Sequence, residues 1–346
     1  MYSRREFGQI LGMSLIGSTL QAANSTVEST KPTVKGVRLG VISYSFNDMP
    51  NVLGQDHIDM VVQNCQAVGA GLVELMCNHA EPVTGYQMQQ AAARAARIGA
   101  TAANPNDGRG AAGRGGVGGG ASRATPSPEA LKARDELREW RLSTPMSHFQ
   151  DIKRKFDDVG TVIYAYCVNG MGADFTGQEI DKMFEQAQTL GATVISTSTT
   201  VEVAQKLVPI VEKHQFPVAF HNHANLTDPN QFATPESFAK ALAMSKYYKI
   251  NLDIGHFTQA NFDAVSYLQQ RHADVSHLHV KDVKRDGGPI LPWGEADTPI
   301  KAVLQLLKKN QWPIPAEVEL EYPIPAGSNS VEEVKKCMAI MKADLE

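Results

Sequence analysis

The sequence alternates eight short, apolar, strand-like segments with helix-like segments over most of its length. A helix between consecutive strands favours parallel strands, because a parallel pair needs a long crossover connection. Eight such repeats over roughly 310 residues favour a closed (β/α)8 TIM barrel of the α/β class over an open sheet. The expected strands begin near residues 37, 72, 161, 194, 217, 250, 277 and 314.

Four consecutive strands of this series end on side chains that commonly bind metal ions. The strand at 217–223 ends with His221 and His223, which point the same way because strand side chains alternate between two faces. In a TIM barrel the carboxyl ends of all strands form one face, where active sites lie. The sequence therefore predicts a metal site at that face. The next three strands contribute Asp253 and His256, then His277, His279, Lys281 and Asp282, and finally Glu317, Glu319 and Glu321.

Composition and motifs exclude several other classes. The formal net charge of the 346 residues is −4, so a nucleic-acid partner is not expected. Neither a glycine-rich dinucleotide turn nor a serine nucleophile elbow is present, so we expect no nucleotide cofactor.

The amino terminus predicts export. Residues 3–8, Ser-Arg-Arg-Glu-Phe-Gly, resemble a twin-arginine export motif, and a short uncharged stretch follows at 10–20. That stretch is too short to span a membrane by itself. We therefore expect residues 1–23 to be an export signal of a bacterial protein. The mature protein would be periplasmic or otherwise exported, with no membrane attachment after signal removal.

The rest of the chain predicts one domain. Residues 24–36 are polar and are expected to form a flexible start, and residues 37–346 form the barrel. Residues 108–120 are dominated by glycine and lack the lysine and hydroxyl residue of a phosphate loop. The segment at about 101–127 is therefore expected to be a flexible surface insertion.

The Asp-x-x-His at 253–256, the His-x-His at 277–279 and the Glu-x-Glu at 317–319 resemble motifs of the xylose isomerase-like TIM barrel superfamily. The resemblance covers residues 37–343, and the superfamily includes sugar phosphate isomerases and epimerases. Its members commonly hold one divalent metal ion through Glu, Asp, His and Glu from strands five to eight.

Three of these ligands carry over directly, as Asp253, His279 and Glu319. The fifth strand departs from the family pattern, because His221 stands where a ligand Glu usually stands. Two imidazoles and two carboxylates suit Mn²⁺, Co²⁺ or Zn²⁺ better than Mg²⁺. The resemblance also implies that His223 and His256 contact the substrate.

The implied substrate is a small carbohydrate, either a sugar or a keto-sugar. A metal ion would polarise its carbonyl, and Glu319, His256 or Lys281 would remove the neighbouring proton. His223 is a further catalytic candidate. Return of the proton makes the protein an isomerase or epimerase. Loss of a leaving group makes it a lyase or dehydratase acting on 3-keto-sugars or keto-glycosides.

Several alternatives stay open from sequence alone. Glu74 and Lys281 are equally consistent with substrate contact and with a structural ion pair. Trp293 is a candidate for stacking on a sugar ring, whereas His277 is expected to play a supporting role in the core. A non-catalytic periplasmic sugar-binding protein is the alternative of another class, and the oligomeric state is left open.

Overall fold

The computed structural model of the chain describes residues 33–89, 127–173 and 175–346. The predicted export signal, residues 24–32 of the N-terminal segment and residues 101–126 of the glycine-rich insertion lie outside the described residues. Within the described part of the chain, no helix combines the length and apolarity needed to cross a membrane.

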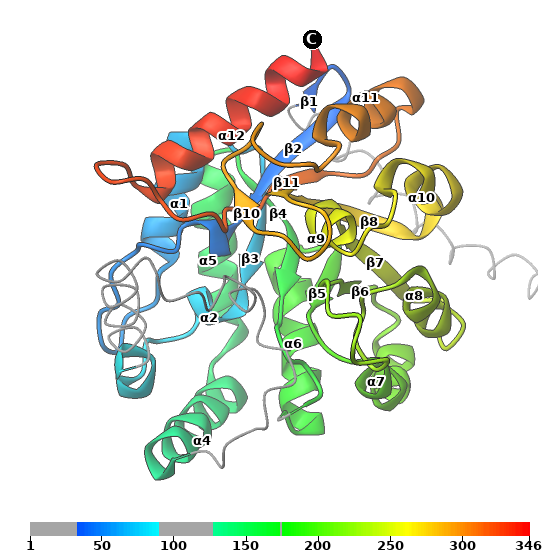
Figure 1. Ribbon diagram of the computed structural model, residues 1–346. Helices are drawn as coiled ribbons and strands as arrows, with labels where there is room; N and C mark the ends of the chain where they lie inside the picture. Colours follow the sequence, from blue (N-terminus) through cyan, green and yellow to red (C-terminus); the bar gives the residue numbers. More distant parts are fainter. Residues whose placement is uncertain (1–32, 90–126, 174) are drawn as a thin grey trace, which may run out of the picture. The chain divides into compact units, whose positions relative to one another are not determined.

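Eight parallel strands of the described residues close into a barrel, which confirms the predicted TIM fold (Figure 1). Each strand pairs with the next along the chain, and the circle closes because β2 pairs with both β3 and β11. Every strand lies within about two residues of its predicted start. The strands are β2 (Val37–Ile42), β3 (Leu72–Met76), β4 (Val162–Cys167), β5 (Val194–Thr197), β6 (Val218–His221), β7 (Tyr248–Asp253), β8 (Val275–Val280) and β11 (Ala316–Val318).

Helices surround this barrel in Figure 1, as βα alternation requires. Their apolar faces pack on the outer face of the strands in one continuous core. The principal helices are α1 (Ile58–Val68), α4 (Pro128–Ser143), α5 (Met146–Asp158), α6 (Gly177–Leu190), α7 (Val201–His214), α8 (Pro235–Leu242), α10 (Ala264–Arg271), α11 (Ile300–Asn310) and α12 (Ser330–Leu345).

Local sequence signals set the ends of these helices. At α6, the Thr176 side chain accepts from the Glu179 backbone, and the Glu179 carboxylate accepts from the Thr176 backbone N–H. The helix ends at Gly191, whose φ of 75° suits a residue without a Cβ. At α8, Thr234 caps the first turn and Pro235 occupies a position that needs no N–H donor.

The interior of the barrel changes from apolar to polar along its axis. One layer is formed by apolar side chains and contains Leu72, Tyr164, Ala165, Val194 and Ala219. The next inward positions of β3, β8 and β11 carry Glu74, His277 and Glu317, all fully buried. Since barrel interiors are usually filled by branched apolar residues, this polar layer indicates a functional use of the strand ends.

Three segments differ from the sequence-based expectation. Residues 33–36 form a hairpin rather than a flexible start, because β1 (Thr33–Val34) pairs with β2 and Gly36 adopts a φ of 87°. A short helix, α9 (Ile254–Gln259), follows β7 directly where no helix was expected. The expected loop after β8 contains a small hairpin of β9 (Asp282–Val283) and β10 (Ile290–Leu291).

Candidate active site and metal centre

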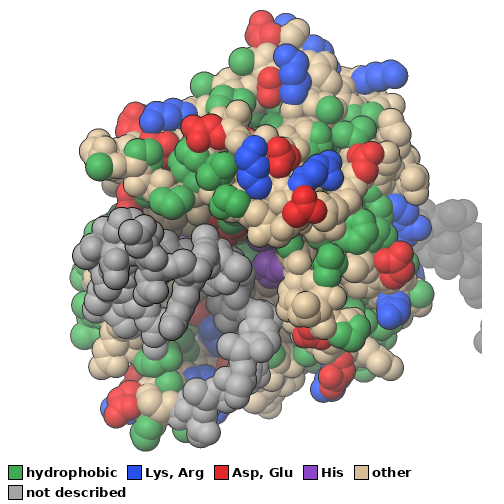
Figure 2. Space-filling view, viewed as in Figure 1, with side chains coloured by type: hydrophobic (Ala, Val, Ile, Leu, Met, Phe, Trp, Pro, Cys, Tyr) green, Lys and Arg blue, Asp and Glu red, His purple; other side chains and the backbone are tan. Residues whose placement is uncertain are grey.

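A pocket opens at the carboxyl ends of the barrel strands and encloses about 550 Å³ of space, part of it continuous with solvent. The face drawn in Figure 2 shows a hollow near its middle in which a histidine side chain is visible. Polar side chains dominate one wall, whereas an apolar group from β2 to β4 forms the other. The apolar wall contains Ile42, Tyr44, Met76 and Cys167.

The four predicted metal ligands come together at the floor of this pocket. His221, Asp253, His279 and Glu319 are buried, and each offers one donor atom within 4.8 Å of the others. They lie at the ends of β6, β7 and β8 and just beyond β11, on inward-facing positions. Because side chains of a strand alternate, the register of these strands brings one donor from each to the barrel axis.

The side chain of Asn222, which follows β6, holds the carboxyl end of β7 in place. Asn222 donates to the backbone carbonyl of Asp253 at 3.1 Å and accepts from the Asp253 N–H at 2.9 Å. The Asp253 carboxylate is divided between two tasks. Its Oδ1 accepts the His256 backbone N–H at 2.8 Å and so caps α9, while Oδ2 faces the cluster.

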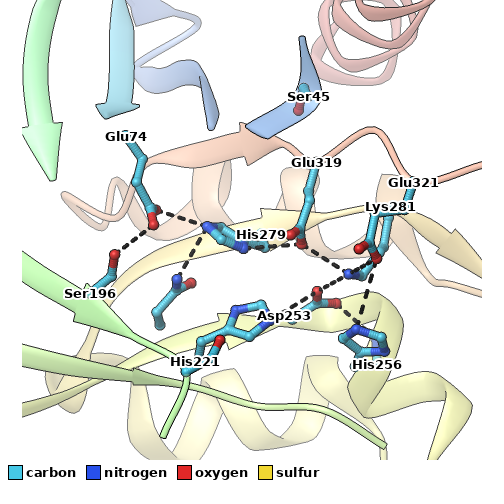
Figure 3. Close-up of polar contacts among 12 residues, drawn as sticks. Ser45, Glu74, Ser196, His221, Asp253, His256, His279, Lys281, Glu319 and Glu321 are labelled. Carbon is cyan, nitrogen blue, oxygen red and sulfur yellow. Dashed lines mark hydrogen bonds and ion pairs between the residues drawn. The ribbon is translucent and has the colours of Figure 1, made fainter. Parts of the chain in front are cut away.

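Lys281 places an ammonium group beside the candidate ligands (Figure 3). Its Nζ lies 2.7 Å from Asp253 Oδ2, 2.9 Å from Glu319 Oε2 and 2.5 Å from Glu321 Oε2. Burial disfavours the charged amine, but these three carboxylates hold the pKa of Lys281 well above its ordinary value. With its ammonium shared among three carboxylates, Lys281 is a poor candidate for a base.

Glu74 is a hydrogen-bond partner of the imidazoles of His277 and His279. One of its oxygens, Oε2, lies 2.7 Å from His277 Nε2 and 2.8 Å from His279 Nε2, and Oε1 accepts from Ser196 at 2.5 Å. Burial alone would raise the pKa of Glu74, but His279 and His277 lower it well below its ordinary value. Glu74 thus lines the pocket as a charged hydrogen-bond partner that orients His279. His277 is fully buried and does not line the pocket, and its supporting role stays a prediction.

Three histidines at the pocket carry free lone pairs near neutral pH. Burial, with neighbouring cationic groups, lowers the pKa of His223 to about 3 and of His256 to about 4. Burial and the nearby His279 lower the pKa of His221 well below its ordinary value. All three are therefore neutral near pH 7 and can act as ligands or bases.

The carboxylates at the floor are crowded. Burial raises the pKa of Asp253 to about 7; Lys281 opposes this shift and Glu319 adds to it. Burial opposes the charge on His279, but Glu74 and Glu319 hold its pKa well above the ordinary value. The raised pKa of His279 thus reports the negative charge of Glu74 and Glu319, which a cation at this floor would also neutralise.

The residues present fit a divalent metal ion. The donor set of two imidazoles and two carboxylates is buried, and its donor atoms lie within 4.8 Å of one another. His221 Nδ1 is buried and makes no hydrogen bond. An ion bound at His279 Nδ1 would replace a proton there, and the Nε2–H would still donate to Glu74. Lys281 would share the carboxylates with the ion.

Two other predicted residues lie away from the pocket. Trp293 is only 8% exposed and packs in the hydrophobic core, so it does not line the pocket. Its position follows from Asp282, whose carboxylate accepts the backbone N–H groups of Gly294, Ala296 and Thr298 and thereby folds the 294–298 loop back. Asp282 is accordingly a structural residue and not a ligand.

Sequence reasoning named one polar residue of the site without a role and missed another. Glu321, named only as a strand-end carboxylate, pairs with Lys281, and its Oε2 lies 3.9 Å from His256 Nε2. Gln259 accepts at His256 Nδ1 at 3.0 Å. Its spacing of three residues from His256 would have been informative only if α9 had been expected.

Gly255 allows α9 to pack closely against Lys281 and Val283, which lie at the junction of β8 and β9. A Cβ there would lie 2.5 Å from Lys281 Cγ, 2.8 Å from Val283 Cγ2 and 2.9 Å from the Lys281 carbonyl oxygen. We therefore expect Gly255→Ala to lower the free energy of unfolding by about 1–3 kcal/mol, measured by urea denaturation. At Gly177 in α6 a Cβ would meet nothing within 4 Å, so Gly177→Ala is the matched control. Equal stability of both variants would contradict the close approach.

Comparisons with known proteins agree with this geometry. The sequence profile of the family described as xylose isomerase-like TIM barrel matches residues 149–343, more than half of the chain. No curated protein matches the sequence at a significant level.

Solved structures share the fold at low sequence identity. A probable 3-DHS dehydratase from Bacillus anthracis, 13% identical, aligns over 88% of this chain and 98% of its own with a TM-score of 0.54. A 3-keto-D-glucoside 4-epimerase from E. coli, 10% identical, covers 89% and 99% with a TM-score of 0.53. An IolI protein with a bound zinc atom, 14% identical, covers 89% and 98% with a TM-score of 0.56.

Proposed function

The chain belongs to the xylose isomerase-like TIM barrel family, and we propose that it is a divalent-metal-dependent isomerase or epimerase acting on a sugar or keto-sugar. The observation that carries this proposal is the convergence of His221, Asp253, His279 and Glu319 below a pocket that also exposes two neutral imidazoles. The relatives that share the fold include a sugar epimerase and a dehydratase, which supports carbohydrate chemistry at this pocket.

The proposed metal ligands are His221, Asp253, His279 and Glu319, with Mn²⁺, Co²⁺ or Zn²⁺ as the ion. When bound, such an ion supplies a Lewis acid that polarises a substrate carbonyl and makes the neighbouring C–H more acidic. Lys281 remains beside the carboxylates and contributes a fixed positive charge to the site.

His256 is the best placed base for the C–H next to the carbonyl. It lines the pocket, and near pH 7 its ring is neutral and can accept a proton. Glu319 accepts from Lys281 and would also hold the metal ion, and both positive charges make its carboxylate a weaker base. His223 faces His256 with ring centroids 5.2 Å apart and can exchange a proton with a substrate oxygen.

The identity of the fifth-strand ligand bears on the outcome of the reaction. His221 replaces the carboxylate that would pair with Glu319 as acid and base in a two-sided epimerisation. A reaction that needs no such acid–base pair is then favoured. It is either isomerisation or elimination of a leaving group from a 3-keto-sugar or keto-glycoside. The lyase is therefore the second candidate function.

The charge of the pocket favours an unphosphorylated substrate. Among the described residues that line it are Glu74, Glu319 and Glu321, but neither lysine nor arginine. The one buried ammonium nearby, Lys281, is already shared among three carboxylates. A phosphate group would meet repulsion without a paired cation. The apolar wall suits the C–H face of a neutral sugar.

We further propose that the protein is exported by the twin-arginine route and works in the periplasm of a bacterium, with no membrane attachment after signal removal. The support is the Ser-Arg-Arg-Glu-Phe-Gly sequence at 3–8. An exported enzyme would meet free and glycosidic sugars rather than phosphorylated intermediates, in agreement with the pocket charge.

Deuterium exchange tests the function directly. Protein loaded with Mn²⁺ or Zn²⁺ and incubated in D₂O with a panel of free and 3-keto-sugars should introduce deuterium at the carbon next to the carbonyl, because that proton is removed and returned. A chelator should stop the exchange, and readdition of the ion should restore it. Mass spectrometry measures the label and also detects products of elimination.

Each arm of this experiment has a contrary outcome. Full exchange after metal removal would refute the metal-dependent mechanism. Binding of a sugar without exchange across the panel would support the non-catalytic sugar-binding alternative. A phosphate ester that exchanges faster than its parent keto-sugar would overturn the assignment of an unphosphorylated substrate.

A further inference from the structure

Helix α9 presents two polar side chains on one face. His256 and Gln259 are three residues apart, a spacing that makes side chains neighbours on a helix. Gln259 Oε1 lies 3.0 Å from His256 Nδ1. Because the Asp253 carboxylate caps the first turn, this short helix is anchored at the same residue that belongs to the candidate metal centre.

The carbonyl group of Gly288 fixes the orientation of the Gln259 side-chain amide. Gln259 Nε2 donates to the carbonyl oxygen of Gly288 at 2.7 Å. A carbonyl can only accept, so the amide nitrogen must face Gly288 and the amide oxygen must face His256. That oxygen can also only accept, and His256 Nδ1 must therefore carry a proton.

The Gly288 carbonyl, which accepts from Gln259, lies in a closely packed turn. Gly288 lies in the turn between β9 and β10, and the neighbouring Gly287 N–H donates to the Gln259 backbone oxygen at 3.0 Å. A Cβ at Gly288 would lie 2.5 Å from Lys284 Cβ, so the turn is closely packed. Gln259 is thus tied to the hairpin by both its main chain and its side chain.

A neutral imidazole protonated at Nδ1 has its lone pair at Nε2. In His256 this atom lies on the side of Glu321, and the residue lines the pocket beside His223. We propose that Gln259 is a positioning residue that relays the Gly288 carbonyl to His256 and fixes the tautomer whose Nε2 can accept the substrate proton. The role of His256 as a base rests on the proposed function, whereas the tautomer does not.

The tautomer can be read without any substrate. Histidine labelled with ¹⁵N distinguishes a protonated Nδ1 from a protonated Nε2 by NMR, and His256→Gln assigns the signal. The zinc-loaded protein should show His256 protonated at Nδ1. Gln259→Leu keeps a similar volume but removes both hydrogen bonds, so we expect it to shift the population toward the Nε2–H form.

Catalysis provides the second readout. On the sugar that exchanges fastest, Gln259→Leu should lower the exchange kcat about 10- to 100-fold while KM stays close to that of the wild type. Gln259→Glu retains an acceptor for Nδ1 and should restore the Nδ1–H tautomer and part of kcat. The control is Asn261→Gly, which removes contacts to Asp286 in the same hairpin without touching His256 and retains the positive φ. It should leave both readouts unchanged.

The outcomes separate the two proposals. A wild-type His256 protonated at Nε2, or a Gln259→Leu variant that keeps both the Nδ1–H tautomer and kcat, would overturn the relay. A changed tautomer with an unchanged kcat would overturn the positioning role. Absence of exchange in the wild type would refute the proposed function, and the NMR spectrum would still decide the tautomer.

Discussion

Asp253→Asn is expected to abolish stoichiometric binding of a divalent metal ion and to lower the deuterium exchange rate by more than about 100-fold, beyond the loss typical of residues that merely orient a ligand. The amide retains an oxygen that can cap α9 through the His256 N–H. It replaces the anionic Oδ2, which lies 2.7 Å from Lys281 Nζ, with a neutral donor. The fold should persist while the charge and one ligand are lost.

Two measurements check this result. Elemental analysis after dialysis gives the metal content, and circular dichroism reports whether the helices remain. The matched control is Asp263→Asn at the start of α10, where the carboxylate caps the next helix through Ser266 and is exposed. It should keep wild-type metal content and exchange. Full metal occupancy in Asp253→Asn would refute the assignment of this residue as a ligand.

The barrel was predictable because its signal is repeated. Each strand is a short apolar run followed by a helix with its own start and stop residues, such as the Thr176 cap and the Gly191 end of α6. Errors in single boundaries do not change the number of repeats. The same regularity places polar residues at the strand ends, and the resemblance to the family selected His221, Asp253, His279 and Glu319 among them.

The parts that escaped prediction depend on contacts between distant segments. The α9 helix has only six residues, too few for a 3.6-residue periodicity, and its start is set by the Asp253 side chain. The hydrogen bonds of Gln259 to His256 and Gly288 could therefore not be predicted from the sequence. Trp293 was expected at the pocket, but hydrogen bonds to Asp282 direct its loop into the core instead.

The second large effect is expected when the buried ammonium is removed. Lys281→Met retains an unbranched side chain of similar length but leaves the carboxylates of Asp253, Glu319 and Glu321 without their shared cation. Breaking a buried ion pair from one side costs about 3–5 kcal/mol, because the remaining charges stay buried and uncompensated. The metal-free variant should therefore melt roughly 5–8 °C below the metal-free wild type by calorimetry.

A divalent ion should reverse much of this loss, since it binds the same carboxylates. At about 100 times its dissociation constant, an ion that binds only the folded state contributes about 2.7 kcal/mol. The ion and the ammonium compete for Asp253 Oδ2 and Glu319 Oε2, so Lys281→Met should also bind the ion more tightly than the wild type. Isothermal titration measures that difference.

The control for this variant is Lys284→Met, three residues along the chain. Lys284 pairs with Asp297 at 3.2 Å at the surface, where both side chains are solvent-exposed and their attraction is screened. Its melting temperature should match the wild type with and without the ion. If metal-free Lys281→Met also melts like the wild type, the carboxylates do not need the ammonium. If the variant is destabilised but no divalent ion restores it, these carboxylates do not bind a metal ion, and the proposed metal centre is wrong.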